Sequence, residues 1–140
     1  MTQLKHIVYV SFSSKALNNA ELKALLKVIR QKNKANGISG LLLYNNSTFI
    51  QVIEGLEDTL HQVFEKIKKD TRHTNVVILL EEAIQSRTFP GWYMGFQQIR
   101  GHQTKKIKGF SDFMNDSSSE LLKGSTQDVM HLLTSFKKHT

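Results

Sequence analysis

The chain has 140 residues, enough for one domain whose core can fold without disulfides or a structural metal. It contains no cysteine, which excludes disulfide bonds, thiolate catalysis and cysteine-ligated zinc. The formal net charge of +7 is compatible with an acidic partner such as nucleic acid. The densest groups of lysine and arginine, however, lie near the ends of two predicted helices, where they complement the helix dipole. The pattern therefore favours solvated helix ends over a nucleic-acid interface.

Membrane and metal sites are also not expected. No apolar run has the length of a membrane span, and the first residues lead into a strand-like segment without an apolar signal region. We therefore expect a cytoplasmic protein. The six histidines show no metal-ligand spacing, and no glycine-rich phosphate loop occurs, so neither a metal site nor nucleotide hydrolysis is predicted.

Residues 4–11 are predicted to form the first strand. Ile7 and Tyr9 point to one face of this strand, and Val8 and Val10 point to the other. Apolar residues on both faces indicate a central strand.

A helix follows, because Asn18 and Glu21 have the spacing of a capping box. The helix ends near Asn33 to Gly37, where asparagine and glycine are natural terminators. Its apolar positions recur with the period of one helix face, at Leu22, Leu25, Leu26 and Ile29.

Residues 36–55 predict a β-hairpin, because two apolar runs are joined by a polar turn at 45–47. On the second strand Phe49, Gln51 and Ile53 share one face. A buried amide without partners costs about 1 to 3 kcal/mol, so Gln51 must be hydrogen-bonded. Tyr9 is the other polar-tipped residue in an apolar row, and the two side chains could meet. Spacing alone favours a purely structural hydrogen bond between them.

The remaining elements complete an α+β fold. A second helix is predicted to begin at residues 57–58 and to end around residues 70–74. Residues 76–80 are predicted to form an interior strand, and residues 92–99 a last strand. The order indicates a ferredoxin-like sandwich, with a mixed sheet of about five strands and two helices on one face. Amphipathic segments at 107–114 and 129–136 are expected to form C-terminal helices that cap the other face, although binding to another chain is the open alternative.

Five separated motifs stand in order along the chain. Besides Tyr9 in the first strand, they are Asn-Lys-Ala-Asn-Gly-Ile-Ser-Gly-Leu-Leu at 33–42, Phe-Ile-Gln-Val-Ile-Glu-Gly at 49–55, Asp-Thr-Arg-His at 70–73 and Phe-Pro-Gly-Trp-Tyr-Met at 89–94. Together they resemble the BLUF family, the blue-light sensors that use flavin. The resemblance covers about residues 4–98, and we take residues 1–98 as the flavin-binding domain and residues 99–140 as a helical extension that packs on the sheet or on a partner.

The resemblance implies a flavin, FAD in the first place and FMN as the alternative, lying between the two helices over Tyr9 and Gln51. It implies photoactive roles for Tyr9, Gln51, Trp92 and Met94, and it leaves open which of Trp92 and Met94 faces the flavin. It further implies flavin contacts from both helices, the hairpin and the end of the second helix, at Tyr9, Leu25, Leu26, Lys32, Asn33, Leu41, Phe49, Gln51, Lys66, Ile67, Asp70, Arg72 and His73.

By the same resemblance, light transfers an electron and a proton from Tyr9 toward the flavin, and their return leaves Gln51 rotated or tautomerised. No substrate is consumed, so the protein is not expected to be an enzyme. Its output is expected to be a separate signalling protein or a change in a homo-oligomer. A ferredoxin-like nucleic-acid-binding module is the alternative, although the hairpin lacks the basic and aromatic pattern of an RNA-binding sheet.

Overall fold

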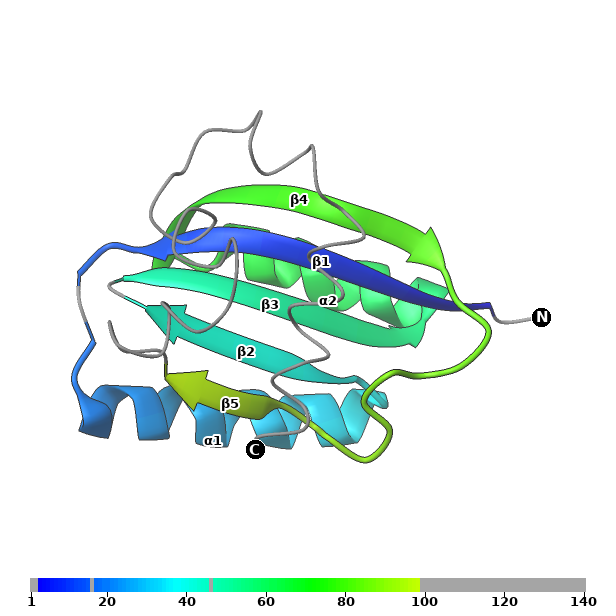
Figure 1. The fold of residues 1–140 in the computed structure, drawn as a ribbon, viewed down its shortest axis with the longest axis horizontal. Helices are drawn as coiled ribbons and strands as arrows, with labels where there is room; N and C mark the ends of the chain where they lie inside the picture. Colours follow the sequence, from blue (N-terminus) through cyan, green and yellow to red (C-terminus); the bar gives the residue numbers. More distant parts are fainter. Residues whose placement is uncertain (1–2, 16, 46, 99–140) are drawn as a thin grey trace, which may run out of the picture.

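The computed structural model describes residues 3–15, 17–45 and 47–98, and these form one mixed sheet with two helices (Figure 1). The strands lie in the order β4-β1-β3-β2-β5; β2 and β5 pair in parallel and the other neighbours pair antiparallel. The predicted order of strands and helices is confirmed. The elements are β1 (Leu4–Ser13), α1 (Asn19–Asn36), β2 (Ser39–Asn45), β3 (Thr48–Leu56), α2 (Glu57–Lys69), β4 (His73–Ala83) and β5 (Gly95–Gln98).

Helix α1 begins and ends at the predicted signals. The side chain of Asn18 accepts from the Glu21 backbone N–H at 2.8 Å, and the Glu21 carboxylate accepts from the Asn18 N–H at 3.1 Å, so the capping box is present. Gly37 ends the helix with φ of +67°, a left-handed conformation that glycine adopts without a Cβ penalty.

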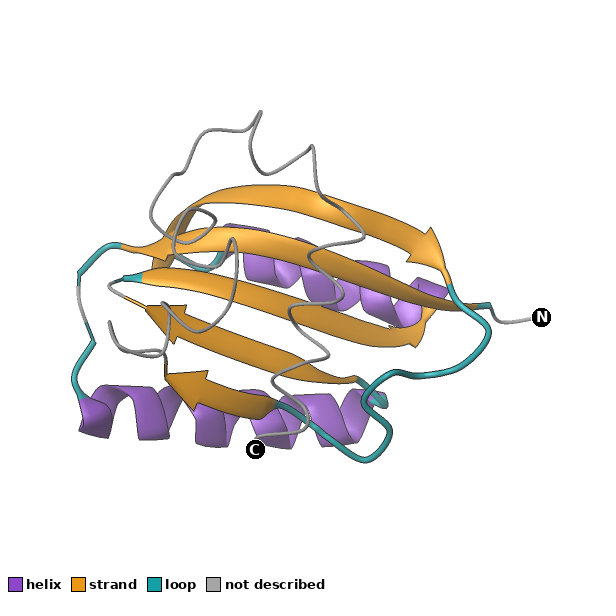
Figure 2. Cartoon of the chain, viewed as in Figure 1, coloured by secondary structure: helices purple, strands orange, loops and turns teal. Residues whose placement is uncertain are grey.

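The two faces of the sheet carry separate apolar clusters, as the alternation predicts. Both helices pack on the face that holds Ile7 and Tyr9, and Figure 2 shows the two helices against the sheet. The helices contribute Leu22 and Leu26 from α1 and Leu60 and Phe64 from α2 to this cluster. The opposite face holds Val8, Val10, Leu41, Leu43, Ile50 and Val52. The C-terminal helices expected to cap that face lie outside the described residues.

Strand β4 corrects one prediction. Residues 76–80 were expected to form an interior strand, but β4 lies at an edge of the described sheet and pairs there with β1 alone. Adjacent residues of β4 differ in burial, since Leu79 is buried and Ile78 is 39% exposed. A short apolar run is compatible with an interior strand or with an edge strand that has one covered face.

Neither α1 nor α2, the two helices of the described chain, is long and apolar enough to cross a membrane.

Candidate functional site

A cavity of about 660 Å³ lies between α1 and α2, over the face of the sheet that carries Tyr9 and Gln51. Helix α1 lines it with Leu25, Ile29 and neighbouring residues, while Leu22 and Leu26 of the same helix are buried in the core. Helix α2 does the same, because Val63 and Ile67 line the cavity while Leu60 and Phe64 pack against the sheet. Each helix therefore uses one stripe for the core and an adjacent stripe for the cavity.

Tyr9 and Gln51 lie at the floor of the cavity, and a hydrogen-bonded series runs from Tyr9 through Gln51 to Met94, which is buried and outside the cavity lining. Tyr9 and Gln51 lie directly opposite each other on β1 and β3, so their side chains project from the same face. The Tyr9 hydroxyl donates to Oε1 of Gln51, and Nε2 of Gln51 donates to Sδ of Met94 at 3.6 Å. The buried amide thus has the partner that its burial requires, and the predicted meeting of Tyr9 with Gln51 is confirmed.

Burial controls the protonation of Tyr9. Its side chain is 1% exposed and its ring lies 5.2 Å from that of Phe64, centroid to centroid. Desolvation strongly raises the pKa of the Tyr9 phenol, and the nearby Asp70 carboxylate raises this pKa further. Tyr9 is therefore a neutral phenol that carries a transferable proton toward Gln51.

Helix α1 reaches from the cavity to the segment that leads into β5. Asn33 lines the cavity, is buried, and donates from Nδ2 to the backbone oxygen of Tyr93. One turn earlier, Nε of Arg30 donates to the backbone oxygen of Met94 at 2.9 Å. These bonds fix the backbone beside Met94, so Asn33 has a structural role in addition to its place in the cavity wall.

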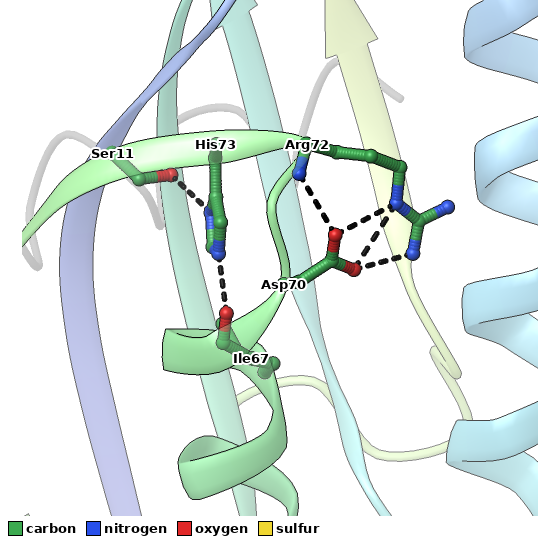
Figure 3. Close-up of polar contacts among 5 residues, drawn as sticks. All are labelled: Ser11, Ile67, Asp70, Arg72 and His73. Atoms are coloured by element: carbon green, nitrogen blue, oxygen red, sulfur yellow. Dashed lines mark hydrogen bonds and ion pairs between the residues drawn. The ribbon is translucent and has the colours of Figure 1, made fainter.

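The end of α2 forms a compact polar turn at one side of the cavity (Figure 3). Arg72 donates from Nε to both oxygens of Asp70, at 3.0 and 3.1 Å, and from Nη2 to Oδ2. This pair lowers the pKa of Asp70 to about 2 and raises the pKa of Arg72. Nδ1 of His73 lies 3.0 Å from Oγ of Ser11, and Nε2 donates to the carbonyl oxygen of Ile67, which can only accept. His73 therefore links α2, β4 and β1.

Cationic side chains gather at the cavity. Lys15 and Arg72 are each paired with a carboxylate, Lys15 with Glu21 at 3.1 Å and Arg72 with Asp70. Lys32 of α1 and Lys66 of α2 also line the cavity, and neither forms an ion pair with another described residue. The site thus combines an apolar interior with two unpaired lysines, one on each helix. Across residues 3–15, 17–45 and 47–98, no group of three or more His, Asp or Glu side chains could hold a metal ion.

The structure places the predicted contact residues in the cavity lining except for Leu26 and Leu41. Leu26 is buried beneath α1 in the core. Leu41 was predicted on the wrong face of the sheet, because it lies opposite Val52 and packs on the side away from the helices. Its neighbour Leu42 lies opposite Gln51 and lines the cavity. The predicted contact residues that line the cavity are Tyr9, Leu25, Lys32, Asn33, Phe49, Gln51, Lys66, Ile67, Asp70, Arg72 and His73.

The structure also separates Trp92 from Met94. Met94 is 1% exposed and contacts Gln51 on the helix-covered face. Trp92 packs against the cluster on the opposite face, with its ring 5.9 Å from that of Phe89, centroid to centroid. The photoactive role predicted for Trp92 therefore has no support from contact with Gln51.

Sequence reasoning missed several lining residues. Leu42 and Ile53 could have been found from strand register, because both share the face of Gln51. The small and polar positions on the helices carry no such signal. Ile29 belongs to the apolar row of α1 and could also have been found. The other lining residues outside the predicted set are Ser11, Lys15, Leu17, Glu21, Ala24, Val28, Asn36, Thr59, Gln62 and Val63.

Comparison with known proteins identifies the family. Residues 4–95 match the sequence profile described as BLUF, "Sensors of blue-light using FAD". The alpha subunit of photoactivated adenylate cyclase from Euglena gracilis is 38% identical over 95 residues, which are 66% of this chain and 9% of that protein. The chain thus spans about a tenth of the length of the cyclase subunits that it matches.

Two solved structures match most of this chain. One is titled "BlrB - a BLUF protein, dark state structure"; it has a TM-score of 0.73 and 26% identity, and the match covers 95% of this chain and 99% of that chain. The other is BlrP1 of Klebsiella pneumoniae with FMN and cyclic diGMP; it has a TM-score of 0.67 and 32% identity, and the match covers 89% of this chain and 35% of that chain.

Proposed function

The chain belongs to the BLUF family of blue-light sensors that use a flavin, and from this premise we propose that its flavin binds in the cavity between α1 and α2. The cavity suits such a ligand, because small-molecule sites of about 300–1,000 Å³ are mostly apolar with a few placed polar groups. Leu25, Phe49 and Ile67 supply apolar walls, and the amides of Asn33 and Gln51 supply donors and acceptors. The observation that carries the proposal is the Tyr9–Gln51–Met94 series, whose first two members lie at the floor of this cavity.

The charged side chains suggest how the rest of the cofactor is held. We assign the polar edge of the ring system to Asn33 and Gln51, and the ribityl and phosphate groups to the side where Lys32, Lys66 and the turn at 70–73 line the cavity. The two unpaired lysines can neutralise a phosphate without breaking an existing ion pair. The family description names FAD, and the related BlrP1 structure contains FMN. We propose FAD as the cofactor, with FMN able to occupy the same site.

The bound flavin supplies a strong photochemical oxidant. Tyr9 is placed to act as the electron and proton donor, because its neutral hydroxyl is buried at the cavity floor and already donates to Oε1 of Gln51. Proton movement along this bond alters what the amide of Gln51 donates and accepts, and the amide can then rotate.

Rotation of Gln51 has a consequence that its neighbours dictate. In the present orientation Nε2 donates to the sulfur of Met94. After rotation the amide oxygen faces this sulfur, and a thioether cannot donate a hydrogen bond. The contact with Met94 is then lost, while Nε2 can donate to the Tyr9 oxygen. Met94 lies immediately before β5, so the change at the amide reaches the segment that precedes residues 99–140.

We propose that the output is binding to a separate signalling protein, with residues 99–140 packing on the far face of the sheet or on that partner. Self-association and a cytoplasmic location remain predictions from the sequence. Light scattering after size-exclusion chromatography, in darkness and under blue light, tests self-association.

The proposal is tested by saturating the purified chain with FAD or FMN and recording absorption before and after blue light. We expect bound flavin and a red shift that reverses in darkness. Gln51→Leu should bind flavin and lose the shift, because leucine has no amide to reorient. Gln31→Leu, the same substitution at an exposed position of α1 outside the cavity lining, is the matched control and should behave as wild type. A chain without bound flavin, or a normal shift in Gln51→Leu, contradicts the proposal.

A further inference from the structure

The segment between β4 and β5, residues 84–94, is anchored by a buried carboxylate. Glu54 of β3 is 0% exposed, and three donors surround it. Oε1 accepts from the Phe89 N–H at 2.7 Å and from Oγ of Ser39 at 2.9 Å, and Oε2 accepts from the Thr88 N–H at 2.9 Å. A buried carboxylate is tolerated only when such bonds replace its hydration, and bonds to a charged group are about twice as strong as neutral ones.

Arg87 closes the same attachment from the loop side. Its Nη1 donates to Oγ of Ser39 at 2.8 Å and to the backbone oxygen of Glu54 at 3.0 Å. Its Nη2 donates to the backbone oxygen of Gly37 at 2.7 Å. The guanidinium thus joins the loop to the start of β2 and to β3, and it places a positive charge beside the hydroxyl that contacts the carboxylate.

A short run of bonds connects this anchor to Met94. The Phe89 oxygen accepts from the Trp92 N–H at 3.1 Å, and Gly91 between them has φ of +80°, as in a turn with proline and then glycine at its centre. The Trp92 oxygen in turn accepts from the Gly40 N–H at 2.8 Å, just before β5 pairs with β2. Met94 follows two residues later and contacts Gln51.

From these contacts we propose that Glu54 is a positioning residue that holds Met94 against Gln51. Glu54 and Gln51 are three residues apart on β3 and therefore project from opposite faces of the sheet. The Glu54 carboxylate lies on the face away from the helices. By fixing the backbone path of residues 87–94, it determines the contact between Met94 and Gln51 on the cavity face. In Figure 1 this path runs from the end of β4, past the ends of the strands between, to the start of β5. The contacts that anchor residues 87–94 all come from the protein chain, whereas the effect of Met94 on a photocycle rests on the proposed function.

The first experiment needs no flavin. Glu54→Gln keeps the size of the side chain but turns one acceptor into an NH₂ group that conflicts with the Thr88 N–H donor. Glu82→Gln is the matched control, because the Glu82 carboxylate bonds His6 at 3.0 Å and does not contact residues 87–94. In the full chain we expect amide exchange at Thr88 and Phe89 to become about tenfold faster in Glu54→Gln. The methyl resonance of Met94 should shift, and fluorescence of Trp92, the single tryptophan, should become easier to quench.

The anchoring role of Glu54 is rejected if Glu54→Gln shows the same amide exchange, Met94 methyl resonance and tryptophan quenching as the wild type. The same changes in Glu82→Gln also overturn it, because the effect is then general. If Glu54→Gln does not fold, Arg87→Gln removes the loop-side attachment and leaves the carboxylate intact. It should give faster exchange and a shifted Met94 resonance, and a wild-type result in that variant rejects the proposal.

The second experiment uses the flavin-loaded chain. Glu54→Gln should slow recovery in darkness about threefold, because a loosely held Met94 stabilises the original amide orientation less well. In a Met94→Ala background the same substitution should have no further effect, since a residue that acts through Met94 is not additive with it. Additive effects reject the positioning role. Failure to bind flavin rejects the proposed function and leaves the flavin-free test of Glu54 decisive.

Discussion

Replacing Tyr9 with phenylalanine removes one hydroxyl group, and its effects on the stability of the fold and on the photocycle can be measured separately. The hydroxyl donates to Oε1 of Gln51, and both side chains are buried, at 1% and 8% exposure. Its loss leaves a buried amide oxygen without this donor, which costs about 1 to 3 kcal/mol. With a urea m-value of about 2 kcal/mol/M, the unfolding midpoint should fall by about 1 M. Flavin should still bind, and the reversible red shift should be absent.

Tyr44→Phe is the matched control for this prediction. The Tyr44 hydroxyl is also buried and accepts from the Leu17 N–H at 2.9 Å, but Tyr44 does not line the cavity. The control should lose about 1 kcal/mol of stability and retain the photocycle. A photocycle in Tyr9→Phe refutes the donor role, and a loss of less than about 0.5 kcal/mol refutes the assigned energy of the buried bond.

The pH dependence of Tyr9→Phe has a definite sign. The folded-state pKa of Tyr9 is raised above its unfolded value of 10.0, so the stability tied to the neutral phenol is complete below pH 10 and falls as pH rises beyond it. The wild type should therefore lose its advantage over Tyr9→Phe above about pH 10. Urea unfolding at pH 7 and at pH 10.5 measures this change.

Other substitutions test separate parts of the site. Met94→Ala should slow dark recovery about two- to tenfold in flash spectroscopy, because the original orientation of Gln51 loses its sulfur acceptor. Trp92→Phe should stay within about twofold of wild type, because Trp92 lies on the opposite face. Asp70→Asn should lower the free energy of unfolding by less than about 1 kcal/mol at pH 7, because the Asp70–Arg72 ion pair is largely exposed. The lowered pKa of Asp70 means that the carboxylate contributes its full stability above pH 3.8 and loses it as the pH falls toward about 2. The urea midpoints of variant and wild type should therefore converge near pH 2. Gly40→Ala places a Cβ 1.9 Å from the backbone oxygen of Val52, and thermal unfolding should show a loss of about 3 kcal/mol in stability. The Cβ of Gly37→Ala meets no atom within 4 Å, so this variant should lose only the about 1 to 2 kcal/mol that a positive φ costs.

Periodicity predicted most of the architecture because it reports which side of an element is covered. The rows at Ile7–Tyr9 and Phe49–Gln51–Ile53 do share the helix-covered face. The capping box and Gly37 gave the ends of α1, because these signals act through local hydrogen bonds and backbone angles. The apolar run at 76–80 does not by itself give the edge position of β4, since neighbours in a sheet are set by tertiary pairing.

The errors at the site have equally physical causes. Leu41 and Leu42 are adjacent leucines on opposite faces, so only the register with Val52 and Gln51 distinguishes them. Trp92 and Met94 are two residues apart and would share a face in a regular strand. They do not, because the turn at Gly91 precedes them and β5 begins only at Gly95. The turn reorients the backbone, and no periodicity in the sequence records that rotation.

The Tyr9–Gln51–Met94 series draws its three groups from β1, β3 and the residue before β5, so it exists only when distant parts of the chain have come together. Strand β1 precedes the other strands in the chain, yet it pairs with β3 and β4. Strand β2 pairs with β3 and also with β5, the last described strand. Such non-local pairing slows folding, and no early fragment contains the complete series. A ligand of the folded form alone stabilises it by mass action, so flavin supply should influence how much of the newly made protein matures.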